Sequence, residues 1–94
     1  MKSIYAVIAD HYGYPAQSNQ LIEECAELIQ AVNKYRRART KEEQEKALDN
    51  YIEEMADVEI MLEQMKYLLR VKEEQMDKVK QYKLKRTIER FEHD

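Results

Sequence analysis

The residues of this sequence best suited to chemistry are carboxylates, and two pairs of them share one spacing. Glu24 and Glu27 lie three residues apart, as do Glu54 and Asp57. Residues three apart are neighbours on one face of a helix. The chain contains 19 Asp and Glu residues, so this spacing alone distinguishes few of them. The deciding question is which carboxylates share a helix face with apolar residues.

The first pair lies on or beside an apolar helix face. The periodicity of the second predicted helix runs through residues that we expect to face the core, namely Leu21, Ile22, Cys25, Leu28, Ile29 and Val32. With Leu21 at zero, Glu24 lies at ~300°, inside this apolar arc, and Glu27 lies at ~240°, at its edge. Gln17 and Gln20 lie at ~320° and ~260° and continue the polar stripe. On helical phase alone they are either polar residues that accompany the carboxylates or solvated residues of the helix start.

The second pair repeats this arrangement on the third predicted helix. With Tyr51 at zero, Glu54 lies at ~300°, between two methionines, Met61 and Met65. Asp57 lies at ~240°, again at the edge of the apolar arc. If the two helices pack antiparallel, all four carboxylates converge.

Converging carboxylates repel one another and destabilise a fold unless a cation neutralises them. Oxygen ligands without His or Cys suit Mg²⁺, with Mn²⁺ as a substitute, and Mg²⁺ often takes substrate phosphates as further ligands. Interhelical salt bridges to Lys or Arg are the alternative, and helical phase alone leaves both open. The other pairs with this spacing are predicted to be structural or solvated: Glu42/Glu45, Glu74/Asp77 and Glu89/Glu92.

The elements that position these residues must be long helices. The chain has one Gly and one Pro, whereas sheets of short strands use both residues in tight turns. Charged residues make up 37% of the chain and apolar residues 44%, so the core must follow narrow stripes on solvated helices. We predict a single all-α domain over residues 1–94, a bundle of about four helices. Because so short a chain buries little surface, we expect a homodimer or homotetramer to complete it.

The helices are predicted from apolar periodicity and capping residues. The periodicity indicates helices over residues 3–12, 15–39, 51–69 and about 73–91. Residues 41–48 form either a separate short helix or the first turns of the third one.

Composition also bears on where the protein acts. One Cys and two His are too few for a structural zinc site within one chain, and a lone Cys suits a reducing cytoplasm. No apolar run is long enough for a membrane span, and no secretory signal is evident at the N-terminus. The net charge of −3 makes nucleic acid an unlikely partner. We therefore expect a cytoplasmic protein with no membrane partner.

Two segments together resemble a known signature. Residues 23–27 read EECAE and residues 54–57 read EMAD, in an apolar helical context. This order is similar to the EExxE…ExxD signature of the MazG-like all-α nucleotide pyrophosphohydrolases, a superfamily that includes dimeric dUTPases and phosphoribosyl-ATP pyrophosphohydrolase. The similarity covers roughly residues 15–91.

The resemblance implies a site and a reaction. Glu24, Glu27, Glu54 and Asp57 would bind Mg²⁺ and form the catalytic centre. The enzyme would cleave a nucleoside triphosphate, NTP or dNTP, to the monophosphate and pyrophosphate. Gln17 and Gln20, on the carboxylate stripe, would then contact the base or sugar of this substrate.

The resemblance also implies a phosphate contact on the last helix. Lys83 and Arg86 match the late-helix KxxR element, whose cations meet substrate phosphates, and Gln81 stands where many members carry Asn. The alternative function is a non-catalytic helical interaction module that keeps a degenerate MazG-like site.

Overall fold

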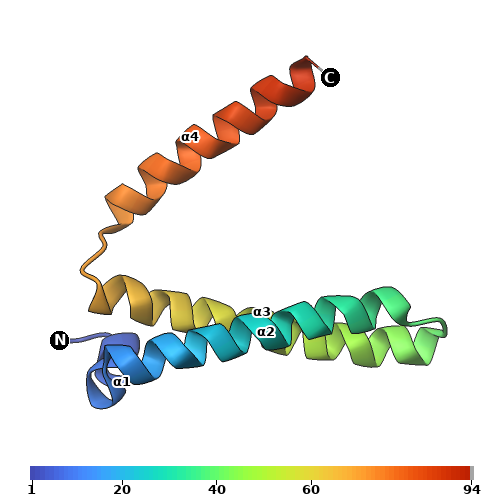
Figure 1. Cartoon of the computed structure of the whole chain (residues 1–94), viewed down its shortest axis with the longest axis horizontal. Helices are drawn as coiled ribbons and strands as arrows, with labels where there is room; N and C mark the ends of the chain where they lie inside the picture. Colours follow the sequence, from blue (N-terminus) through green and yellow to red (C-terminus); the bar gives the residue numbers. More distant parts are fainter. Residues whose placement is uncertain (94) are drawn as a thin grey trace.

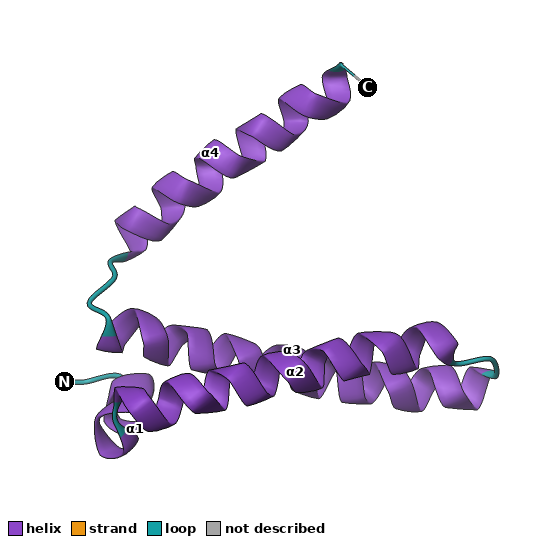
Figure 2. Ribbon diagram, viewed as in Figure 1, coloured by secondary structure: helices purple, strands orange, loops and turns teal. Residues whose placement is uncertain are grey.

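The computed structural model describes residues 1–93, which form four α-helices and no strand (Figure 2). The helices are α1 (Ile4–Tyr12), α2 (Tyr14–Arg37), α3 (Lys41–Leu68) and α4 (Glu73–Glu92). This confirms the predicted all-α class. No helix within the described range combines the length and apolar character that a membrane crossing requires.

The helix boundaries follow the local sequence. The side chain of Ser3 accepts a hydrogen bond from the Ala6 N–H at 3.2 Å and caps α1. Gly13 separates α1 from α2 at φ 84°, a backbone angle that side-chain-bearing residues rarely adopt. Thr40 accepts a hydrogen bond from the Glu43 N–H at 3.1 Å and caps α3.

Residues 41–48 belong to α3, which settles the alternative left open by the sequence. The helix continues through Asp49 and Asn50, so neither residue begins a new helix. Ala47 and Asn50 are half-buried. The segment therefore forms the first turns of a 28-residue helix.

Helices α2 and α3 form a long antiparallel hairpin, with α1 packed at one end against α3 (Figure 1). The buried apolar side chains are few: Ala6, Ala9, Ala31, Met61 and Met65. One polar pair lies among them, because the Gln17 Nε2 donates a 2.7 Å hydrogen bond to the Oε1 of Gln64. The buried core of the two long helices thus consists of Ala31, the two methionines and one satisfied amide pair, and α1 adds two alanines.

The predicted core face of α2 is partly wrong. Ile22 and Ile29 are 66% and 63% exposed, whereas Gln17 and Ala31 are buried. The face that meets α3 is therefore centred near ~300–320°, the phase of Glu24, and not at the middle of the apolar arc. The apolar arc of α2 is wider than the strip that one neighbouring helix covers. Part of the arc therefore stays exposed within the described residues.

Helix α4 extends away from the hairpin as a separate arm (Figure 1). No Cα of α4 lies within 8 Å of a Cα in another helix of residues 1–93. The connection bends at Arg70, at φ 57°, and Lys66 on α3 pairs with Glu73 on α4 at 2.6 Å. The predicted bundle therefore contains α1 to α3, and its fourth helix is not packed within the chain.

Candidate metal centre

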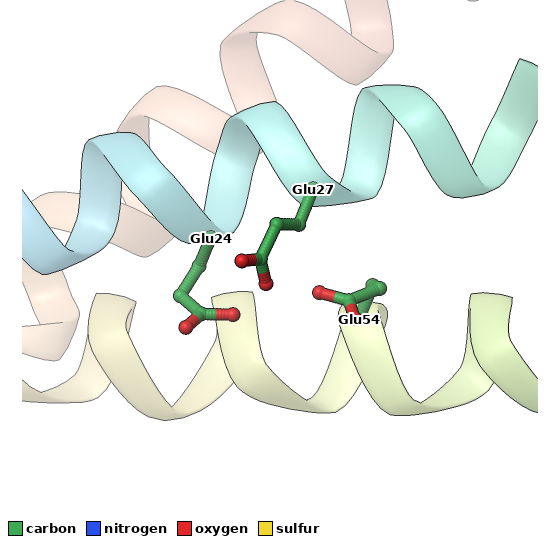
Figure 3. A group of neighbouring side chains, drawn as sticks. All are labelled: Glu24, Glu27 and Glu54. Carbon is green, nitrogen blue, oxygen red and sulfur yellow. The ribbon is translucent and has the colours of Figure 1, made fainter.

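Three carboxylates from two helices meet in the middle of the hairpin. Glu24 and Glu27 extend from α2 toward α3, and Glu54 extends from α3 toward them (Figure 3). One carboxylate oxygen of each lies within 4.8 Å of the others. The antiparallel packing of α2 on α3 thus brings together three of the four predicted ligands.

Two of these carboxylates have an oxygen without a partner. The Oε2 atoms of Glu24 and Glu54 are buried and form no hydrogen bond to any described residue. The other oxygen of Glu24 accepts a 2.7 Å hydrogen bond from the Nε2 of Gln20. A buried carboxylate oxygen without a partner is destabilising, so this arrangement favours a ligand that satisfies it.

The surroundings disfavour negative charge on Glu24 and Glu54. Burial raises the pKa of Glu24, the charges of Asp57 and Glu27 raise it further, and the Gln20 hydrogen bond opposes them. Burial also raises the pKa of Glu54, and the neighbouring Glu27 carboxylate adds to the effect, followed by Asp57 and Glu24. Without a cation, the fold thus makes the ionised forms of Glu24 and Glu54 less favourable than they are in water.

Asp57 is the fourth predicted ligand and lies beside the other three. It is half-buried on α3, one turn after Glu54. Its charge raises the pKa of both Glu24 and Glu54. It is not among the three carboxylates whose oxygens lie within 4.8 Å of one another.

The alternative of interhelical salt bridges is not formed. Within residues 1–93, the ion pairs join Lys2 to Asp10, and Lys66 to Glu63 and Glu73. None of them includes a carboxylate of the hairpin centre. The negative charge of this centre is therefore not neutralised by Lys or Arg of the described chain.

The four residues predicted to bind substrate lie in different places. Gln20 is adjacent to the carboxylates, through its bond to Glu24. Gln17 is in the core with its amide bonded to another residue, which differs from the predicted substrate contact. Lys83 and Arg86 lie on α4, away from the hairpin, and the Arg86 guanidinium lies 5.7 Å from the Tyr82 ring centroid.

Gln64, the acceptor of the buried amide pair, was not among the predicted site residues. Its phase on α3 is ~220°, seven residues after Asp57 and next to the edge of the apolar arc. Its side chain is 2% exposed. Extending the polar stripe of α3 by one heptad would have found it.

The raised pKa values predict how the stability of the metal-free chain depends on pH. A carboxyl whose pKa is higher in the folded than in the unfolded state stabilises the fold below its usual value near 4.5, and this stabilisation is lost as pH rises through the raised value. Glu54→Gln removes the titrating group, so we expect the variant to gain stability relative to wild type as pH rises from 4 to 8. Urea denaturation with chelator present measures the difference.

Glu53→Gln is the matched control, because Glu53 is exposed on the same helix. We expect its stability relative to wild type to change little over the same pH range. A constant difference between Glu54→Gln and wild type at all pH values would contradict the prediction.

Comparison of the chain with protein-family models, with curated proteins and with solved structures found no match. The resemblance to the MazG-like superfamily therefore rests on the two carboxylate segments and remains a prediction.

Proposed function

We propose that this chain is a Mg²⁺-dependent nucleotide pyrophosphohydrolase that converts an NTP or dNTP to the monophosphate and pyrophosphate. The observation that supports it is the pair of buried, unpartnered carboxylate oxygens of Glu24 and Glu54, on facing helices, with Glu27 beside them. A carboxylate cluster that only stabilises the fold or faces solvent has no use for buried oxygens without hydrogen-bond partners.

The residues at this centre suit a divalent metal ion. All donors are carboxylate oxygens, the ligand type that Mg²⁺ and Mn²⁺ prefer. Glu24, Glu27, Glu54 and Asp57 would hold the ion, and Gln20 would keep the Glu24 carboxylate in place. When bound, Mg²⁺ supplies charge neutralisation for phosphate oxygens and activates water.

The carboxylates differ in exposure, which suggests different roles in hydrolysis. Glu24 and Glu54 are half-buried and are placed to bind and orient the ion. Glu27 is exposed, so its carboxylate is placed to accept the proton of an attacking water. Lys83 and Arg86 would bind the phosphates of the leaving pyrophosphate.

The phosphate contact ties this proposal to a homodimer or homotetramer. In a single chain the backbone of α4 does not approach that of α2 or α3. An α4 arm supplied by another chain can bring its cations to the carboxylates, so the complete site would contain residues of two chains.

A nucleotide panel assayed for pyrophosphate release, with Mg²⁺, with Mn²⁺ and with chelator, tests the proposal. We expect release from at least one nucleoside triphosphate, dependent on the metal, with the monophosphate as the second product. Absence of release across canonical and modified nucleotides would favour the non-catalytic interaction module.

Metal-linked stability provides an independent measurement. A ligand that binds only the folded state at 100 times its Kd stabilises it by about 2.7 kcal/mol, so we expect saturating Mg²⁺ to raise the Tm by several degrees. The Glu54→Gln variant should lose this response. An equal rise in wild type and variant would show that Mg²⁺ acts elsewhere on the chain.

A further inference from the structure

We propose that the loop end of the α2–α3 hairpin binds a pyrophosphate group, free or as part of a nucleotide. This site is separate from the carboxylate centre and needs no metal ion. Its test measures binding and not hydrolysis, so failure of either proposal leaves the other standing.

The first observation is a pocket where α2 ends and α3 begins. It has a volume of about 450 Å³ and lies at the end of the hairpin opposite α1 (Figure 1). Lys34 and Arg37 of α2 and Lys46 of α3 line it, and the acid in its wall is Glu43. Three cations from two helices therefore share one concave space.

The second observation is that this positive charge is not compensated by ion pairs. The ion pairs of residues 1–93 include none of the three cations. Lys34 and Arg37 are three residues apart on α2, so two like charges lie side by side and repel each other. The Oε2 of Glu43 accepts a 2.9 Å hydrogen bond from the backbone N–H of Arg39, which holds this carboxylate at the loop. An anion in the pocket would relieve the repulsion.

The helix dipoles account for only two of the three cations. Lys34 and Arg37 lie in the last turn of α2, where the dipole favours positive charge. Lys46 lies near the start of α3, the end of a helix that favours negative charge. A bound anion accounts for all three.

The lining residues suit phosphate oxygens. The planar guanidinium of Arg37 can donate two parallel hydrogen bonds to one phosphate, and the ammonium groups of Lys34 and Lys46 can neutralise further charge. Asn50 is half-buried and lines the same pocket, so its amide can donate another hydrogen bond. A pyrophosphate group has enough negative charge and enough oxygens for all of these donors.

The shape of the pocket favours a small anion over nucleic acid. Its volume lies within the range of about 300–1,000 Å³ that is typical of small-molecule sites. Residues 34–41 read KYRRARTK, whereas the whole chain has a net charge of −3. The positive charge at this end of the hairpin is thus gathered at one turn and does not form the extended stripe that a nucleic-acid backbone requires.

The pocket is distinct from the carboxylate centre. Lys34 lies seven residues after Glu27, and Lys46 lies eight residues before Glu54. These separations correspond to roughly 10–12 Å along the helices. When a chelator removes metal ions, the negative charge of the centre repels pyrophosphate, so binding that remains belongs to another site.

Isothermal titration calorimetry with inorganic pyrophosphate and chelator tests the proposal on the full chain. Three charge-assisted contacts predict a dissociation constant below about 1 mM. Lys34→Gln and Lys46→Gln should each raise it about tenfold. Arg36→Gln and Lys41→Gln are the matched controls, because each removes an exposed cation from the same helices but outside the pocket. They should change it less than about twofold.

Two further measurements identify the ligand and locate the site. Adenosine diphosphate carries the same group, so tighter binding of pyrophosphate would identify the free anion as the ligand, and tighter binding of the diphosphate would identify a nucleotide. Backbone chemical-shift changes in the wild type should centre on residues 34–50, which locates the site even if a variant fails to fold. Glu24→Gln should bind pyrophosphate as the wild type does, so a loss of hydrolysis in that variant does not bear on this pocket.

Four results would overturn the proposal. One is a wild type that does not bind pyrophosphate at millimolar concentration, and another is an equal weakening in the pocket variants and their controls. The third is a set of chemical-shift changes centred on α4 or on the carboxylates. The fourth is duplex DNA that binds more tightly than pyrophosphate and is lost with Lys34→Gln and Lys46→Gln, because this end would then contact nucleic acid.

Discussion

Glu24→Gln is expected to reduce Mg²⁺-dependent pyrophosphate release at least about 100-fold, because loss of a direct metal ligand costs more than the 10–100-fold of an outer-shell change. The amide keeps the size of the side chain but cannot supply the negative charge that the ion requires. The Oε2 of Glu24 forms no hydrogen bond within the described chain, so the substitution breaks no internal contact there. Pyrophosphate release at saturating Mg²⁺ measures the loss, and circular dichroism shows whether helicity is retained.

The neighbouring Glu23→Gln variant is the control for this loss. Glu23 has the same charge and lies on the same helix, but it is exposed on the polar side of α2. We expect it to retain most of the activity. Equal activity of Glu24→Gln and wild type would contradict the proposed metal centre. Equal loss in both variants would point to a general effect of charge.

Gln64→Ala is expected to lower the free energy of unfolding by about 2–4 kcal/mol. The side chain of Gln64 is 2% exposed, and its Oε1 accepts the 2.7 Å hydrogen bond from Gln17. Truncation therefore leaves a cavity between α2 and α3 and a buried Gln17 amide without its acceptor. Urea denaturation followed by circular dichroism measures the change.

Two further variants separate the causes of this destabilisation. Gln81→Ala removes a glutamine from the exposed surface of α4, and we expect a change within about 0.5 kcal/mol. Replacing Gln17 and Gln64 together by Leu removes both polar groups, so it should cost less than Gln64→Ala. If Gln64→Ala were as mild as Gln81→Ala, the buried amide pair would contribute little to the hairpin.

Local sequence was sufficient to predict the helices. The scarcity of Gly and Pro excluded a sheet of short strands, Gly13 marked the break after α1, and Thr40 marked the start of α3. These features act through the backbone of nearby residues, so they do not depend on the rest of the fold. Helical phase likewise identified Glu24, Glu54 and Asp57 as carboxylates on or beside an apolar face.

Helical phase could not determine which part of each apolar arc is covered. It placed Ile22 and Ile29 in the core, but both are exposed. A helix meets one neighbour along a narrow strip, and the position of that strip depends on which side chains of both helices fit together. In this hairpin the strip includes Ala31 and the Gln17–Gln64 pair, and it lies close to Glu24.

Composition, periodicity and capping residues were sufficient to predict an all-α chain with two matched carboxylate pairs on two of its helices. The packing of the helices was needed to establish that Glu24, Glu27 and Glu54 meet, that two of their oxygens are buried without partners among the described residues, and that α4 lies apart from them. This difference arises from the range of the interactions involved. Capping and periodicity act within a few residues, whereas the meeting of α2 with α3 depends on packing between residues far apart in the sequence.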